Sequence, residues 1–171
     1  HKDQHTYDHS LRAAMLTAQF GRFAGFSKSD IGVLCMGALL KDIGKVKVSR
    51  TILLKKDRTP QEEVQYRKFV NYGVDILRSL GGVEAKVISI VRYHCERMDG
   101  SGFPQGVGGN KIPLHARIVG IATEYDSISS PRESKYPVAP SRAVSLIYNM
   151  RNKGFQEDLV VKFIQAIGLY P

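Results

Sequence analysis

The sequence predicts an all-α fold, built as a single helical bundle, and three observations support this. Apolar residues recur at helical spacing in most segments, and no segment shows a convincing strand-like alternation. Helix start signals and glycine stop signals separate these segments. With 171 residues, 43% of them apolar, the chain is long enough to bury one core. We therefore expect one domain over residues 1–171 and, because the first residue is His1, a domain excised from a longer multidomain chain.

The first two predicted helices cover the segments 11–18 and 31–39. Ser27 followed by Asp30 predicts the N-terminal cap of the second helix. Cys35 lies on an apolar stripe, so we expect it in the core. The predicted inward stripes are Leu11, Ala14, Met15 and Ala18 in the first helix, and Ile31, Leu34, Cys35, Ala38 and Leu39 in the second.

The later helices begin with a strong start signal in the segment 59–62. Thr59 and Glu62 form a capping box, with Pro60 at the first helical position, and the helix is expected to run to Gly81. Residues 129–140 read as an irregular connection. The predicted inward faces are Val70, Val74 and Leu77; then Val87, Ile90, Val91 and His94; then Val119, Ala122, Thr123 and Asp126; and finally Val160, Phe163, Ile164 and Ile167.

Composition and charge exclude several classes of protein. No run approaches the roughly 18 apolar residues of a membrane span, and no signal peptide opens the sequence, so we expect a cytoplasmic domain without membrane contact. Two cysteines make neither a disulfide framework nor a zinc-finger pattern. The net charge of +9 favours a phosphorylated small ligand or an acidic partner. Without a dense basic block, nucleic acid is not an expected partner.

Polar side chains recur at inward-facing or helix-end positions, which is the pattern of a site. Taken singly, each has a structural explanation, because a buried histidine is more often hydrogen-bonded than metal-bound. The segment 92–104 organises the group, since a helix carrying His94 runs directly into a glycine-punctuated loop. The recurring polar residues are His9, Lys41, Asp42, Lys45, Asn71, His94, Cys95, Thr123 and Asp126.

Several ordered motifs carry a family resemblance over nearly the whole chain. The segments are 6–12, 42–45, 46–55, 92–104 and 112–118, and together they resemble the HD-GYP domain, a bacterial branch of the HD metal-dependent phosphohydrolases. The resemblance implies a helical domain whose active members hydrolyse cyclic di-GMP. It also implies a two- or three-metal site, with iron or manganese, at which metal-activated water attacks a phosphodiester.

The resemblance preserves part of the family's metal-ligand set and replaces the rest. Preserved candidates are His9, Asp42 and His94, and His5 stands near the place of an additional acidic ligand. Lys41, Asn71, Cys95 and Thr123 stand where the family has other ligands. Lys41 is the substitution that argues most strongly against a bound metal, because an ammonium group has no lone pair for a metal and repels a cation. We therefore expect Lys41 to pair with Asp42 in the metal's place, no bound cofactor, and no competent catalytic role for Asp42 or Lys45.

Ligand and partner recognition are less altered than the metal site. Lys45 matches a substrate-facing lysine of the family, and Arg132 and Lys135 match a basic pair, although solvated loop charge also explains that pair. Phe103 replaces the signature tyrosine and keeps an aromatic face. The signature loop, made of Gly100, Ser101, Gly102, Phe103 and Pro104, is the expected contact for a diguanylate cyclase domain or another signalling protein.

Three functions follow from these observations. The leading hypothesis is a catalytically degenerate domain acting as a regulatory or protein-interaction module in cyclic di-GMP signalling. The alternative is an active cyclic di-GMP phosphodiesterase whose iron or manganese is held by an altered set. That set would be His9, Asp42, His94, Cys95 and Asp126. The third is a sensor that binds the nucleotide through Lys45, Arg132 and Lys135 without hydrolysing it.

Overall fold

The computed structural model describes residues 4–130 and 138–168, and these residues form an all-α fold, as predicted. Within these two ranges no strand is present, and an isolated bridge between Arg151 and Phe155 is the one β-type contact. No described helix combines the length and apolar character needed to cross a membrane.

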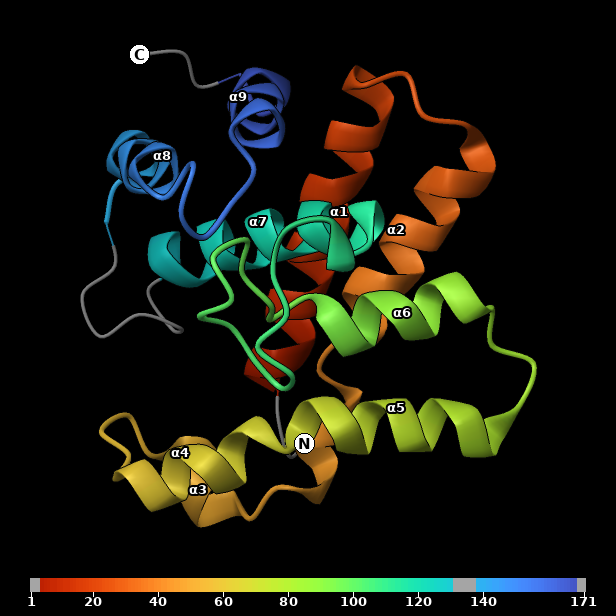
Figure 1. Ribbon diagram of the computed structural model, residues 1–171, viewed down its shortest axis with the longest axis vertical. Coiled ribbons are helices and arrows are strands. Elements are labelled where there is room, and N and C mark those ends of the chain that lie inside the picture. Colours follow the sequence, from red (N-terminus) through yellow and green to blue (C-terminus); the bar gives the residue numbers. More distant parts are fainter. Residues whose placement is uncertain (1–3, 131–137, 169–171) are drawn as a thin grey trace.

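The helices form a bundle with two peripheral pairs. Figure 1 shows α3 and α4 at one end of the molecule and α8 and α9 at the opposite end, with α1, α2, α6 and α7 between them. The elements in chain order are α1 (Gln4–Phe23), α2 (Lys28–Leu40), η1 (Ile43–Lys47), α3 (Arg50–Leu54), α4 (Pro60–Arg67), α5 (Phe69–Leu80), α6 (Ala85–Tyr93), η2 (Gly109–Lys111), α7 (Leu114–Ser129), α8 (Pro140–Asn149) and α9 (Glu157–Ala166).

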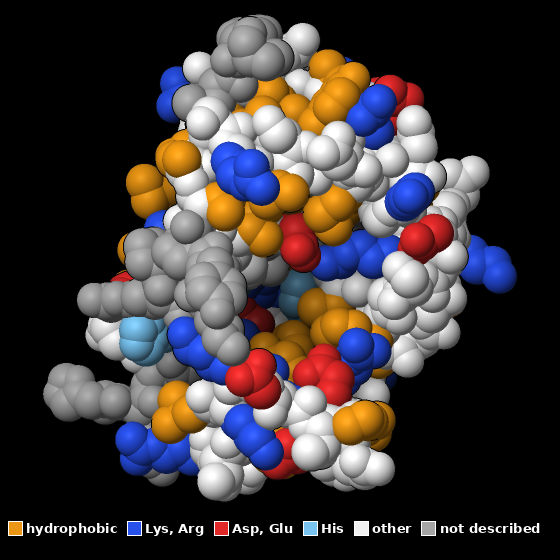
Figure 2. All heavy atoms as spheres, turned by 90° about the vertical axis from the view of Figure 1, so that its left-hand side faces the viewer, with side chains coloured by type: hydrophobic (Ala, Val, Ile, Leu, Met, Phe, Trp, Pro, Cys, Tyr) orange, Lys and Arg blue, Asp and Glu red, His pale blue; other side chains and the backbone are white. Residues whose placement is uncertain are grey.

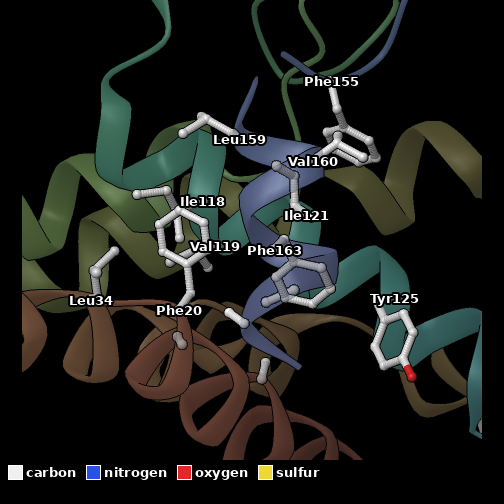
Figure 3. Close-up of a cluster of buried hydrophobic side chains, with 14 of the residues drawn as sticks. Phe20, Leu34, Ile118, Val119, Ile121, Tyr125, Phe155, Leu159, Val160 and Phe163 are labelled. Atoms are coloured by element: carbon white, nitrogen blue, oxygen red, sulfur yellow. The ribbon is translucent and has the colours of Figure 1, made fainter. Parts of the chain in front are cut away.

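The main core lies where α7 and α9 pack on α1 and α2. Figure 3 shows Phe20, Leu34, Ile118, Val119 and Phe163 converging there, and all are buried. Each such side chain contributes about 1.5–3 kcal/mol relative to an exposed position. A smaller cluster of Val74, Leu77 and Val91 joins α5 to α6. These two clusters hold the helices whose ends carry the polar site.

The inward face of α1 differs from the predicted apolar stripe. Leu11 and Met15 are 40% and 65% exposed, and the buried residues are His9, Ser10, Ala13, Ala14, Thr17, Phe20 and Gly21. Polar residues occupy part of this face because charged partners on other helices meet them. On α2, Leu39 is exposed and Cys35 is half-buried, so the predicted stripe there is also only partly correct.

The capping predictions are confirmed, but the predicted helix after Thr59 is two helices. Ser27 caps α2, and Thr59 and Glu62 form the capping box of α4. The helix is interrupted at Lys68: α4 ends at Arg67 and buries no residue, and α5 begins with the buried Phe69. The stop at Gly81, which has a φ of 69°, is confirmed.

Two further features were not predicted. The helix α8 begins with Pro140 and buries Ala143, Val144 and Ile147. The short η1 lies directly on the backbone of α5: a Cβ on Gly44 would stand 1.9 Å from the carbonyl oxygen of Phe69. This close approach brings the polar end of α2 against the first turn of α5.

Candidate functional site

The candidate site lies where the first half of α1, the end of α2, η1, the start of α5, the end of α6 and α7 meet. Figure 2 shows the molecule hollowed at the centre of one face, where hydrophobic, basic, acidic and histidine side chains are all visible. The sequence-predicted residues His9, Lys41, Asp42, His94 and Asp126 are all buried here.

A buried ion pair forms the centre of the site. Lys41 ends α2, and its Nζ donates to Oδ2 of Asp42; their side chains are 0% and 5% exposed. Lys45, one turn further on in η1, places its Nζ 3.1 Å from Oδ1 of Asp42. Burial alone would raise the pKa of the Asp42 carboxyl, but the two lysines hold that pKa well below its usual range. The expected Lys41–Asp42 pairing is therefore present.

A second ionic group joins α1 to α7. His9 donates through Nδ1 to Oδ2 of Asp126 over 2.5 Å, and Arg12 donates to both oxygens of the same carboxylate, over 2.7 and 3.0 Å. Against the effect of burial, these donors lower the pKa of Asp126. The role of Arg12 was missed in the sequence, although its spacing of three from His9 places both on one helix face.

His94 and Cys95 interact with each other at the end of α6. The Nδ1 of His94 lies 2.9 Å from the carbonyl oxygen of Val91, so this nitrogen carries the hydrogen. Burial lowers the pKa of His94 to about 4 and raises the pKa of the Cys95 thiol to about 12. At neutral pH the thiol can thus donate to the lone pair on Nε2 of His94, 3.2 Å away. A metal ion would need that same lone pair.

Two of the predicted positions do not point into the site as expected. Asn71 is exposed, and the α5 side chain that reaches His94 is Phe69, with the two ring centroids 6.1 Å apart. Thr123 is half-buried and donates through Oγ1 to the carbonyl oxygen of Val119 in its own helix. The assignment of Asn71 to the site was wrong, because Phe69 faces inward from the same helix.

Aromatic rings and cations border the ionic centre. Phe69 lies between Lys45, whose Nζ is 5.3 Å from its ring centroid, and Phe103, whose ring centroid is 6.2 Å away. The guanidinium of Arg67 stacks over Phe103 at 4.8 Å. Such contacts are cation–π interactions, each worth about 0.5–2 kcal/mol according to exposure. Phe103 is half-buried, so the expected aromatic face is present, but part of it is covered by protein.

The same cationic border extends to α4. The guanidinium of Arg58 lies 3.8 Å from the ring centroid of Tyr66, and Nζ of Lys45 lies 5.9 Å from that centroid. Burial raises the pKa of Tyr66, so its hydroxyl stays protonated at neutral pH. Lys45, expected to face a phosphate, is thus held between a carboxylate and two aromatic rings.

The signature loop is fixed by backbone contacts. A Cβ on Gly102 would stand 2.4 Å from the carbonyl oxygen of Cys95, to which the N–H of Phe103 donates over 3.2 Å. Glu96 accepts the N–H of Gln105 over 2.7 Å. The loop therefore packs directly on the end of α6.

The outer part of this loop has its own local hydrogen bonds. Asp99 accepts both the N–H and the hydroxyl of Ser101, over 3.0 and 2.6 Å. Gly100 has a φ of 79°, which favours glycine, and the peptide bond between Phe103 and Pro104 is cis. Ser101 is exposed, so the loop presents a defined surface to solvent.

Some predicted residues lie away from the ionic centre or beyond the described parts of the chain. His5 is exposed on the first turn of α1. Arg132 and Lys135, the expected basic pair, fall within 131–137 and outside the described residues.

The residues of the site do not fit the two- or three-metal centre implied by the resemblance. The Lys41 ammonium lies on the Asp42 carboxylate, and Asp126 is bound by His9 and Arg12. Within residues 4–130 and 138–168, no group of three or more His, Cys, Asp or Glu side chains is placed to hold a metal ion.

The pattern that defines the HD-domain family matches residues 1–159. The chain belongs to the HD-domain family. This HD domain is 31% identical over 139 residues to the cyclic di-GMP phosphodiesterase response regulator RpfG of Xanthomonas campestris pv. campestris, covering 80% of the chain and 36% of that protein. It is 30% identical over 170 residues to the cyclic di-GMP phosphodiesterase PA4108 of Pseudomonas aeruginosa, covering 99% of the chain and 41% of that protein.

The fold of this HD domain also matches a solved structure. The HDG"Y"P protein Bd1817 from Bdellovibrio bacteriovorus superimposes with a TM-score of 0.79 at 18% identity, covering 97% of the chain and 53% of that structure. The expected relationship to HD-GYP proteins is thereby confirmed. The HD domain spans less than half the length of the two phosphodiesterases, so their activities pass to it only as proposals. The loss of metal ligands stays a prediction.

Proposed function

We propose that this HD domain is a catalytically inactive regulatory or protein-interaction module in cyclic di-GMP signalling. The observation that carries the proposal is the fully buried ammonium of Lys41 bound to Asp42. A cation that belongs to the protein neutralises the carboxylate that would otherwise attract a metal. Without a metal there is no metal-bound hydroxide to attack a phosphodiester.

The other remnant ligands support the same conclusion. Asp126 is bound by His9 and Arg12, and the thiol of Cys95 is placed to occupy the free lone pair of His94. These groups stabilise the helix ends through interactions within the protein. The polar atoms of the site therefore serve the fold.

Hydrolysis is the first test of this proposal. The purified HD domain, reconstituted anaerobically with iron or with manganese, is incubated with cyclic di-GMP, and linear product and GMP are measured by chromatography. We expect no product, whereas the Pseudomonas aeruginosa relative treated in the same way serves as a positive control. Turnover that depends on the added metal would refute the proposal.

The signature loop is the proposed contact for a protein partner such as a diguanylate cyclase domain. Its fixed backbone and exposed Ser101 favour recognition without a large ordering cost. A pull-down with a diguanylate cyclase domain should weaken for Ser101→Arg and stay unchanged for Ser79→Arg, an exposed serine on α5. Equal capture by both variants would argue against this contact.

Nucleotide sensing is a variant of the same role, because Lys45 lies at the ionic centre beside the rings of Tyr66 and Phe69. Calorimetry with cyclic di-GMP, repeated on Arg132→Ala, separates nucleotide sensing from protein binding. Binding that weakens in this variant supports a sensor, and the absence of binding to the unmodified domain leaves the protein-interaction role.

Active hydrolysis remains the second candidate, because the matched relatives are named cyclic di-GMP phosphodiesterases. It would require iron or manganese held by His9, Asp42, His94, Cys95 and Asp126. In the described arrangement, Asp42 binds Lys41, and Asp126 accepts from His9 and Arg12. The lone pair on Nε2 of His94 faces the thiol of Cys95, 3.2 Å away. The hydrolysis assay above decides between the two candidates.

A further inference from the structure

A pocket of about 710 Å³ adjoins the ionic centre and shares Asp42 and Lys45 with it. It opens between the first turns of α1, the end of α2, η1 and α3, near the end of the molecule that holds α3 in Figure 1. We call it the α1–α3 pocket. Its volume falls in the range of small-molecule sites, about 300–1,000 Å³.

The walls of the α1–α3 pocket are mainly aliphatic. Four different elements each contribute an aliphatic side chain to them. Leu11 belongs to α1, Leu39 to α2, Val46 to η1 and Leu53 to α3. Leu39 and Val46 are 39% and 78% exposed. Converging apolar side chains left open to solvent in a concave site indicate a ligand with an apolar part.

Cations line the same pocket. Lys45 and Arg50 both contribute to it, and Asp42 lies at its inner end. Among the described residues that line the pocket, the two cations Lys45 and Arg50 stand against one carboxylate, that of Asp42. The polar end of a ligand in this pocket would therefore be anionic.

The chemistry of the walls favours an aliphatic chain over a nucleotide base. Base recognition commonly uses aromatic stacking, and the aromatic residues Tyr66, Phe69 and Phe103 are not among the residues that line this pocket. Tyr7 is its one aromatic lining residue in the described part of the chain. A saturated hydrocarbon chain can pack against leucine and valine side chains without stacking partners or hydrogen bonds.

We propose that the α1–α3 pocket binds a medium-chain aliphatic carboxylate, with its chain against Leu11, Leu39, Val46 and Leu53 and its head group near Lys45 and Arg50. The proposal goes beyond the regulatory role and does not depend on it, because ligand binding is measured directly and without metal or nucleotide. It would give the domain a ligand whose chemistry differs from that of a cyclic dinucleotide.

Calorimetry with dodecanoate, below its micelle concentration, tests the proposal. We expect one site per chain, with dodecanol and acetate each binding at least about tenfold more weakly, because each lacks one half of the ligand. Val46→Gln and Arg50→Gln should each weaken dodecanoate binding by about fivefold. Both side chains are exposed, so neither substitution should disturb the core.

Matched controls separate the pocket from general surfactant binding. Leu80→Gln removes an apolar side chain on α5 that is 69% exposed, against 78% for Val46, and Lys162→Gln removes an exposed cation on α9. Both should bind dodecanoate like the unmodified domain. No binding, several equivalent sites, binding that Val46→Gln and Arg50→Gln leave unchanged, or equal affinity for dodecanol would each overturn the proposal.

Discussion

Lys41 is the residue on which this account depends most. The Lys41 side chain is 0% exposed, and burial disfavours its charged form and lowers its pKa. The carboxylate of Asp42 acts in the opposite direction and favours the charged form. The pairing with Asp42 was inferred from the family resemblance, in which Lys41 stands where the family has a metal-binding histidine. Burial of the pair could not be predicted, since it depends on α1, α5 and α6 closing over that end.

Replacing Lys41 with Met should lower the free energy of unfolding by about 3 kcal/mol, because Asp42 would keep its buried charge with Lys45 alone. Urea unfolding measures the change. The double variant Lys41→Met/Asp42→Asn should be more stable than the single one, because it also removes the carboxylate charge. A single variant as stable as the unmodified domain would contradict the described pair.

His94 should make stability depend on pH in a defined window. Its pKa is about 4 when folded and about 6.5 in an unfolded chain, so between these values only the unfolded state takes up the proton. The free energy of unfolding should therefore rise by up to about 3 kcal/mol from pH 4 to 6.5 and then level off. The pKa values of Asp42 and Asp126 are lowered in the folded protein, so both carboxylates stabilise the fold. This stabilisation is lost only below about pH 4, as falling pH protonates them.

Urea unfolding at a series of pH values tests this prediction. His94→Gln should flatten the rise between pH 4 and 6.5, whereas His5→Gln, at an exposed position, should retain it. An unchanged slope in His94→Gln would assign the rise to other groups.

At the scale of elements, helix periodicity explains which predictions succeeded. The inward faces of α6 and α9 were largely predicted from the sequence, because the residues buried within these two helices are apolar. The inward face of α1 was not, because His9 and Ser10 are buried by partners far away in sequence. Asn71 and Phe69 are two residues apart, about 200° around a helix, so Asn71 faces outward while Phe69 faces His94.

The contact between η1 and α5 should be intolerant of any side chain at Gly44. Gly44→Ala would place a Cβ 1.9 Å from the backbone oxygen of Phe69, so we expect a loss of at least about 3 kcal/mol in unfolding free energy. Gly32→Ala is the matched control, because its added Cβ meets nothing within 4 Å. In the exposed face of α2 this change should stabilise the protein by about 0.5–1 kcal/mol. Equal effects of the two changes would contradict the described crossing.

At the scale of the whole molecule, the all-α bundle could be predicted because local periodicity and caps recur along the chain. The site could be predicted only in part, since it is assembled from α1, α2, α5, α6 and α7. Arg12 and Phe69 enter it through packing rather than through a motif. The site is thus a property of how five helices meet, and loss of metal binding should be distributed over several of them.

This distribution predicts that no single substitution restores the metal site. Lys41→His alone should neither bind metal nor hydrolyse cyclic di-GMP, because Asn71, Cys95 and Thr123 still stand in place of the expected ligands. Hydrolysis by Lys41→His after anaerobic reconstitution with iron or manganese, at the rate of an active relative, would refute the claim of distributed loss.

Metal content is the most direct measurement of the central claim that Lys41 takes the metal's place. The domain is reconstituted anaerobically with iron or manganese and freed of unbound metal, and the metal-to-protein ratio is measured by inductively coupled plasma mass spectrometry. The account predicts that the unmodified domain retains no more metal than the buffer control. Two bound metal ions per chain in the unmodified domain would contradict it.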